Sequence, residues 1–313
     1  MAKQKAVKKG GNPLRRNTTP MLVMFLTPAV LLYLIVFLYP TIRTFIMSFC
    51  KVEGVTDPVS TWQFSGLTNY VKSFNNNMFQ TAMLNLGRLW LVGGIAVMAL
   101  ALIFAVALTN GMQGKKFFRS VIYLPNLVSA VAMGTMWLYY ALSKESYGLL
   151  NTIIGWFGGS NVMWTDPHHK FWSMLIAYCF GMVGYHMLIF ASGIERISED
   201  YYEAATLDGA NKLGQFRYIT LPLLKGVFKT NITMWSVTSV GFFVWSQLFS
   251  SVTADNQTIT PMVYLYMQIF GAGNSVTERN SGLGAAVGVM LSVCVVLIFW
   301  LCNHLLKDDD LEF

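Results

Sequence analysis

The chain has 313 residues, of which 54% are apolar and only 12% are charged, and its mean hydropathy is +0.49. A water-soluble domain of this length would carry about 25% charged residues to solvate its surface. The composition therefore excludes an ordinary soluble protein and indicates a chain that lies largely within a membrane.

Six stretches of the sequence contain no Asp, Glu, Lys or Arg and exceed the roughly 20 residues that a helix needs to cross a bilayer. In chain order they are residues 17–42, 89–113, 120–143, 171–194, 230–254 and 280–306. Helices are expected because a helix satisfies its own backbone hydrogen bonds in hydrocarbon. The sequence thus predicts an all-α integral membrane protein with six transmembrane helices, forming one transmembrane domain over residues 17–307.

Lys and Arg are concentrated on one side of these six stretches. They occur in an N-terminal arm (1–16), in the turn 114–119, in the loop 195–229 and at Lys307, which precedes a short acidic tail (308–313). Because cytoplasmic segments are enriched in Lys and Arg, both termini are predicted to be cytoplasmic. This bias also explains the net charge of +7, so the basic arm is expected to lie near membrane lipid and nucleic-acid binding is not expected.

The loop between the fourth and fifth stretches is the longest cytoplasmic segment and is polar. Ser198 is suited to cap a helix, and Gly209 is suited to end that helix in a left-handed conformation. Pro222 limits a second short helix and favours a new helical start toward the fifth stretch. The loop is therefore predicted to be a helix–corner–helix that can dock another protein, with an ordinary hairpin between spans as the alternative.

Nine residues of this loop follow a two-part pattern, with eight residues between the parts. They are Glu203, Ala204, Ala205, Asp208, Gly209 and Ala210, then Ile219, Leu221 and Pro222. The pattern resembles the EAA loop of binding-protein-dependent ABC importer permeases. Together with the run Gly148-Leu-Leu-Asn151, it is similar to the carbohydrate-uptake branch, in the subunit type that pairs with a second permease.

The resemblance implies an importer in the bacterial inner membrane that moves a sugar, for which we expect an oligosaccharide. It implies four partners: a second homologous permease, ATPase subunits that receive the loop, an extracellular solute-binding protein and the sugar itself. The only approach to a phosphate-binding loop, residues 209–214, is followed by Gln215 and Phe216 where Lys and Ser or Thr are required. ATP and magnesium are therefore expected on the partner ATPase. We expect no cofactor, metal or enzymatic activity on this chain.

Candidate residues for the path of a polar solute lie within the apolar stretches. Four of them share one helical face of the fifth stretch, where the resemblance also implies ligand contacts: Trp235, Thr238, Ser239 and Phe242. Further candidates are Tyr178, Met182 and Tyr185 in the fourth stretch and Asn126 in the third. Ordinary helix packing is the alternative for each, and His186 is expected to have a structural role rather than to relay protons.

For the substrate, the alternative within the same type of importer is a non-sugar solute such as glycerol phosphate. A channel or an ion-coupled carrier is a more distant alternative. None of the six stretches contains Asp or Glu, which ion-coupled carriers usually need within the membrane. The sequence therefore favours a carrier driven by ATP on another chain.

Overall fold

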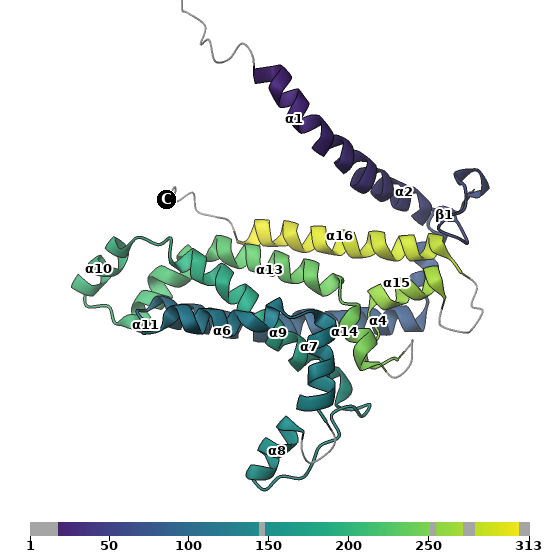
Figure 1. Ribbon diagram of the computed structural model, residues 1–313. Coiled ribbons are helices and arrows are strands. Elements are labelled where there is room, and N and C mark those ends of the chain that lie inside the picture. The colour runs from purple at the N-terminus through teal and green to yellow at the C-terminus, as the bar shows by residue number, and fades with distance from the viewer. Residues whose placement is uncertain (1–17, 144–147, 251–254, 272–278, 307–313) are drawn as a thin grey trace, which may run out of the picture.

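A computed structural model describes residues 18–143, 148–250, 255–271 and 279–306. Within these residues the protein is helical except for one short antiparallel strand pair, β1 (Cys50–Lys51) with β2 (Gln63–Phe64). The long helices run side by side in an elongated bundle, and shorter helices gather at its two ends (Figure 1). The predicted arm 1–16 and tail 308–313 lie outside the described residues.

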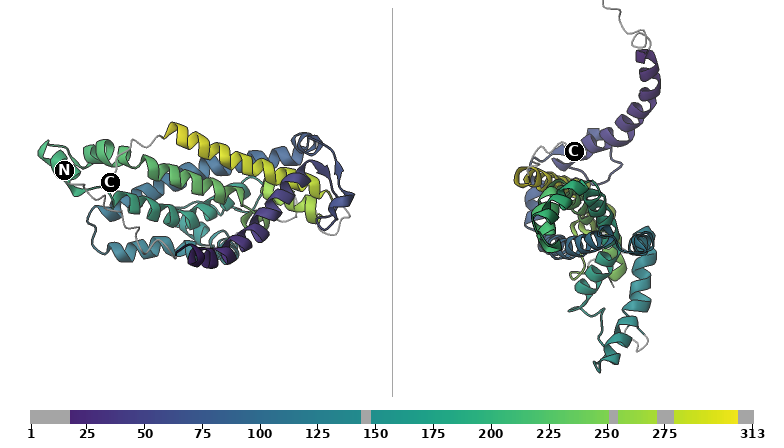
Figure 2. Two further views of the ribbon diagram at one scale, coloured as in Figure 1. Left: turned by 90° about the horizontal axis from the view of Figure 1, so that it is seen from above. Right: turned by 90° about the vertical axis from the view of Figure 1, so that its left-hand side faces the viewer.

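The first predicted stretch forms a long apolar rod that leaves the bundle. It consists of α1 (Thr18–Leu32), the π-helical turn η2 (Tyr33–Leu38) and α2 (Tyr39–Ser48). None of its most apolar 18-residue window is buried within this chain, and α1 projects away from the other helices (Figures 1 and 2). The rod is therefore held to its own chain only near α2.

The second stretch is part of a longer helix than the sequence indicated. The helix α4 (Asn77–Arg88) continues through η4 (Leu89–Gly93) into α5 (Gly94–Thr109), a total of 33 residues. It begins where the Asn76 side chain accepts hydrogen bonds from two backbone N–H groups of its first turn. Arg88 lies inside this helix, so the uncharged stretch begins at residue 89, 12 residues after the helix does.

The third predicted stretch is broken rather than continuous. Helix α6 (Lys115–Leu127) is followed by α7 (Ala130–Met136) and η5 (Trp137–Ala141), and the two parts are bent by 98°. The break lies at Val128–Ser129, where the Ser129 side chain accepts a hydrogen bond from Ala132 N and starts a new helix. Beyond it, α8 (Leu149–Trp156) extends away from the bundle (Figure 1).

The fourth and sixth stretches agree with the sequence prediction to within a residue or two. Helix α9 (Lys170–Ile194) and helix α16 (Ser281–Leu305) each have 25 residues. Helix α9 is central: it packs on α5, α6 and α13. Gly184 allows the approach of α6, because a Cβ at this position would clash with the carbonyl oxygen of Ile122.

The fifth stretch differs from the prediction. Helix α13 (Lys225–Val240) has only 16 residues, starts before the expected position and ends at Gly241. A second helix, α14 (Val244–Phe249), follows, and α15 (Pro261–Phe270) then leads toward α16. Four helices of the described residues are long and apolar enough to cross a membrane, or five if the bent pair α6–α7 counts as one.

The remaining helices are short. At the end of the bundle that holds β1 are η3 (Val59–Thr61) and α3 (Thr68–Phe74). At the opposite end are α10 (Glu199–Leu207), α11 (Lys212–Gln215), η6 (Phe216–Thr220) and α12 (Leu221–Leu223). The C-terminal end of α16 points toward this second end (Figure 1).

Candidate functional site

The segment between α9 and α13, residues 195–224, forms the predicted helix–corner–helix and is called here the α9–α13 loop. The Ser198 side chain accepts a hydrogen bond from Asp200 N at the start of α10. Gly209 ends the helix with a φ of +81°. The N–H of Gly209 donates to Thr206 O at 3.0 Å and that of Ala210 donates to Ala205 O at 2.8 Å, the paired bonds of a Schellman motif. The predicted cap and corner are confirmed.

Side-chain hydrogen bonds hold the two sides of the α9–α13 loop together. The Gln215 amide donates to Thr206 Oγ1 at 2.8 Å and to Tyr202 O at 3.3 Å. The hydroxyl groups of Tyr202 and Thr220 lie 3.0 Å apart. Gln215 and Thr220 are only 4% and 5% exposed. This clamp was missed at the level of sequence, where Gln215 was noted only as a departure from a phosphate-binding loop.

The outward surface of the α9–α13 loop combines free carboxylates with exposed apolar side chains. Of the residues in the two-part pattern, Glu203, Ala204, Asp208, Gly209, Leu221 and Pro222 are exposed, and Ala205, Ala210 and Ile219 are half-buried. Leu207 is 90% exposed and Leu213 is 73% exposed, although neither is needed to start or end a helix. Such a stiff surface, with small residues beside unpartnered leucines, is suited to contact a second protein.

The inner side of the loop faces the end of α5 across a hollow of about 420 Å³. Its walls include Leu102 and Val106 of α5, Asn110 directly after α5, and Tyr202 and Phe216 of the loop. The start of the loop is also linked to α6 by an ion pair between Glu195 and Arg119. The loop is thus attached at its two ends and at one side, and its outer surface is free.

The structure places the candidate solute-path residues in two different environments. Tyr178, Trp235 and Phe242 are buried, and the Tyr178 ring lies 5.5 Å from that of Trp235 and 4.8 Å from that of Phe242. Ser239 is fully buried, whereas Thr238 is on the exposed side of α13. The four residues of the expected face therefore divide between the packed core and the surface.

The other candidates lie between these extremes. Met182 and Tyr185 are half-buried on α9. The Asn126 amide donates to Gly181 O at 3.2 Å, so it links α6 to α9. Helix packing accounts for these contacts, and the role of each residue in solute passage stays a prediction.

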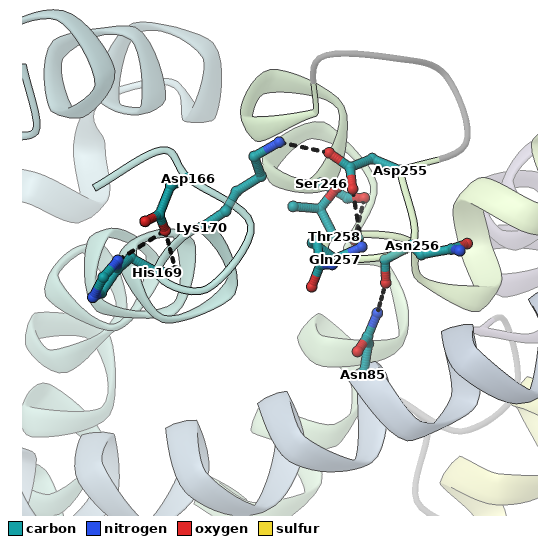
Figure 3. Close-up of polar contacts among 9 residues, drawn as sticks. All are labelled: Asn85, Asp166, His169, Lys170, Ser246, Asp255, Asn256, Gln257 and Thr258. Atoms are coloured by element: carbon teal, nitrogen blue, oxygen red, sulfur yellow. Dashed lines mark hydrogen bonds and ion pairs between the residues drawn. The ribbon is translucent and has the colours of Figure 1, made fainter. Parts of the chain in front are cut away.

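A polar cluster at the opposite end of the bundle was not anticipated from the sequence (Figure 3). Lys170, the first residue of α9, pairs with Asp255 at 2.7 Å, and the two side chains are 9% and 10% exposed. The Asn85 amide donates to the carbonyl oxygens of Asn256 and Ile259 at 3.1 and 3.0 Å. The cluster therefore ties α4 and α9 to the connection that precedes α15.

Just before α9, Asp166 accepts hydrogen bonds from the His169 backbone N–H at 2.7 Å and from its ring at 2.8 Å. The backbone bond is the main reason that the pKa of Asp166 is lowered from its ordinary value. Within the part of the chain that the structure describes, no group of three His, Cys, Asp or Glu side chains is arranged to hold a metal.

The apolar helices are long enough to cross a membrane, and a rigid exposed loop joins two of the elements of this helical bundle. The fold is that of a crystallised bacterial ABC transporter for import of the acidic polysaccharide alginate, with a TM-score of 0.75, 19% identity and coverage of 93% of this chain and 96% of that one. The same transporter with an alginate pentasaccharide-bound periplasmic protein matches with a TM-score of 0.74, 19% identity and coverage of 92% and 94%.

The chain belongs to the family of binding-protein-dependent transport system inner membrane components, whose profile matches residues 98–308. Similar relatives include the arabinooligosaccharides permease AraP of Bacillus subtilis, 30% identical over 278 residues, with coverage of 88% of this chain and 85% of the relative. Another is the lactose permease LacF of Rhizobium radiobacter, 29% identical over 259 residues, with coverage of 79% and 82%. The predicted family and inner-membrane location are confirmed.

Proposed function

We propose that this chain is one transmembrane subunit of an ABC importer that passes a sugar, and specifically an oligosaccharide, to the cytoplasm. The observation that carries the proposal is the α9–α13 loop, a capped and clamped corner whose outer face is free. ATP closes the ATPase dimer, the loop is carried with it, and the cavity between the two permeases opens outward. ATP and magnesium are bound by the ATPase and not by this chain.

The sugar substrate is supported by the relatives. Besides arabinooligosaccharides and lactose, their names include starch degradation products, at 28% identity, and diacetylchitobiose, at 25%. One relative at 29% identity takes up osmoprotective compounds, so a small osmolyte is an outcome that the substrate test must include. The partners are an external binding protein, a second permease and ATPase subunits.

We further propose six membrane crossings, with both termini on the side of the α9–α13 loop. The bent pair α6–α7 would be the third crossing, and α13 with α14 would be the fifth. Breaks inside a span are tolerated where neighbouring helices satisfy the freed backbone groups. At the second break, Thr260 Oγ1 donates to Phe242 O at 2.6 Å, which is such a partner.

The test is uptake of labelled sugars by vesicles that contain this chain, its partner permease, the ATPase and the binding protein. The panel should include mono-, di- and longer saccharides, glycerol phosphate and an osmolyte. We expect saturable uptake of a saccharide that requires ATP and is abolished by Gly209→Pro, because Pro cannot adopt a φ of +81°. Leu305→Ala, an exposed change at the end of α16, is a matched control that should leave uptake unchanged.

Uptake that continues without ATP, or in the Gly209→Pro variant, would refute the coupling mechanism. Import of glycerol phosphate or an osmolyte alone would keep the mechanism and refute the sugar. The two results therefore test the ATP-driven mechanism and the identity of the substrate separately.

A further inference from the structure

A buried hydrogen bond joins the two helices on either side of the α9–α13 loop. His186 Nδ1 of α9 lies 2.7 Å from Asn231 Oδ1 of α13, and both side chains are fully buried. The Asn231 amide N–H donates to Val227 O at 3.2 Å, so its oxygen faces the ring and His186 Nδ1 is the donor. The bond therefore connects the helix that enters the loop to the helix that leaves it.

Between this bond and the loop, the same two helices touch at two further levels. The rings of Phe190 and Phe228 are 4.8 Å apart in an edge-to-face arrangement. Next along α9, a Cβ at Gly193 would lie 2.5 Å from the side chain of Val227, so the helices approach more closely than a larger residue would allow. The two helices and the clamped loop thus form one closed unit, which we call the lever.

Burying the His186–Asn231 pair at this position is energetically less favourable than burying two apolar side chains. Polar groups in an apolar interior are unfavourable unless they are hydrogen-bonded, and His186 Nε2 has no hydrogen-bond partner among the described residues. Two apolar side chains would pack without that cost. A polar pair does, however, fix one register of two helices, whereas apolar contacts allow neighbouring registers.

The position of the pair suits the transfer of movement rather than of protons. Among the described residues, the ring of His186 also contacts Tyr185 and Trp235, and no carboxylate there is a partner of His186. Trp235 lies 5.9 Å from His186 and 5.5 Å from the Tyr178 ring. A displacement of the lever would therefore reach the buried aromatic core directly.

We propose that the His186–Asn231 hydrogen bond is the positioning contact that makes α9, the α9–α13 loop and α13 move as one stiff lever. The proposal rests on the function proposed above, since a lever has a purpose only if the loop receives the movement of an ATPase. Without this bond the loop would still dock, but α9 and α13 would shift against each other. ATP hydrolysis would then be incompletely converted into sugar import.

The first experiment measures sugar imported per ATP hydrolysed by the complete complex in vesicles. His186→Leu and Asn231→Leu should each lower this ratio about threefold to fifteenfold, the range that corresponds to hydrogen bonds between membrane helices. ATP hydrolysis itself should continue. The double variant should be no more uncoupled than either single one, because the bond is already lost in each.

Two control variants separate positioning from general stability. His186→Gln keeps an N–H donor near Asn231 and should keep the ratio close to that of the unaltered complex. Asn69→Leu removes an asparagine that is 3% exposed and bonds to Ser48 O and Cys50 O outside the lever, so it should lower stability without changing the ratio. Equal ratios in His186→Leu and His186→Gln, or an equal loss in Asn69→Leu, would overturn the proposal.

A second experiment does not depend on the sugar. Spin labels at Ile176 of α9 and Val237 of α13, both on exposed positions, report the distance between the two helices in the assembled complex. The distance distribution should be narrow in the unaltered protein, broad in His186→Leu and narrow again in His186→Gln. An unchanged width of the distance distribution in His186→Leu would refute the lever, whatever the uptake assays show. Failure of the unaltered complex to import any sugar would instead refute the proposed function.

Discussion

Replacing Lys170 by Met should destabilise the protein by about 3–5 kcal/mol, because it leaves the Asp255 carboxylate in a buried site without the lysine. The two side chains are 9% and 10% exposed, and their charged atoms lie 2.7 Å apart. Asp255→Asn should cost a similar amount, since it removes the opposite charge. The double variant Lys170→Met/Asp255→Asn removes both charges. It keeps a side-chain oxygen at position 255 that can accept a hydrogen bond from the Gln257 N–H, as the Asp255 carboxylate does at 2.9 Å. We therefore expect it to recover most of the loss, to within about 1 kcal/mol.

Unfolding of the purified protein in mixed micelles, followed by helical content as denaturing detergent increases, measures these free energies. Arg119→Met is the comparison, because the Arg119–Glu195 pair is 35% and 45% exposed. An exposed ion pair contributes at most about 1 kcal/mol. The reasoning is refuted if Lys170→Met costs no more than Arg119→Met. It is also refuted if the double variant is less stable than both single ones.

Four further outcomes follow from the loop and its neighbours. Gly209→Ala should destabilise the corner by about 1–2 kcal/mol, and Gly209→Asn by less. Only the backbone is strained, because a Cβ at Gly209 meets nothing within 4 Å. The loss should be seen as faster amide exchange in α10. Gln215→Leu should cost about 0.5–1.5 kcal/mol in the same assay because it removes the bonds to Thr206 Oγ1 and Tyr202 O; unchanged exchange would contradict this. A cysteine at Leu213, in a protein without its native cysteines, should react with an impermeant label only in inside-out vesicles, whereas labelling of intact cells would reverse the proposed topology. The lowered pKa of Asp166 means that its carboxylate adds stability at neutral pH that is lost as the pH falls below 3.8, so Asp166→Asn should reduce the acid-induced loss of stability in micelles.

Features set by neighbouring residues could be predicted from the sequence. The limits of α9 follow from charges close to its ends, at Lys170 and Glu195. The corner of the loop follows from a serine cap and a glycine, which act within a single turn. These parts agree with the structure because no distant contact is needed to produce them.

Features set by distant contacts could not be predicted. The end of α13 depends on Thr260, which bonds to Phe242 O from 18 residues away. The helix through Arg88 contains Asn85, whose amide is satisfied by carbonyl groups 171 and 174 residues further along. An uncharged stretch of sequence gives no sign of either contact. The predicted fifth stretch is therefore longer than α13, and the predicted second stretch is shorter than the helix that runs from α4 through α5.

The same limit applies to the solute path. Periodicity predicted Trp235 and Phe242 on one face of a single helix, but α13 ends before Phe242, and the pattern could not say whether that face meets a cavity or another helix. The structure packs both rings against Tyr178 of α9. The exposed face of α13, with Thr238, is the side that the second permease and the solute could reach in the proposed assembly.

Helix α9 connects the two polar regions of the protein. Its first residue, Lys170, belongs to the polar cluster with Asp255, and its last residue, Ile194, adjoins the α9–α13 loop. A straight helix of this length spans about 37 Å, and 61% of its most apolar window is buried, compared with none in the rod of α1 and α2. Under the proposal made above, the His186–Asn231 bond keeps this buried helix from sliding against α13. In the proposed mechanism, a displacement that begins at the loop is therefore transmitted along α9 to the Lys170 end.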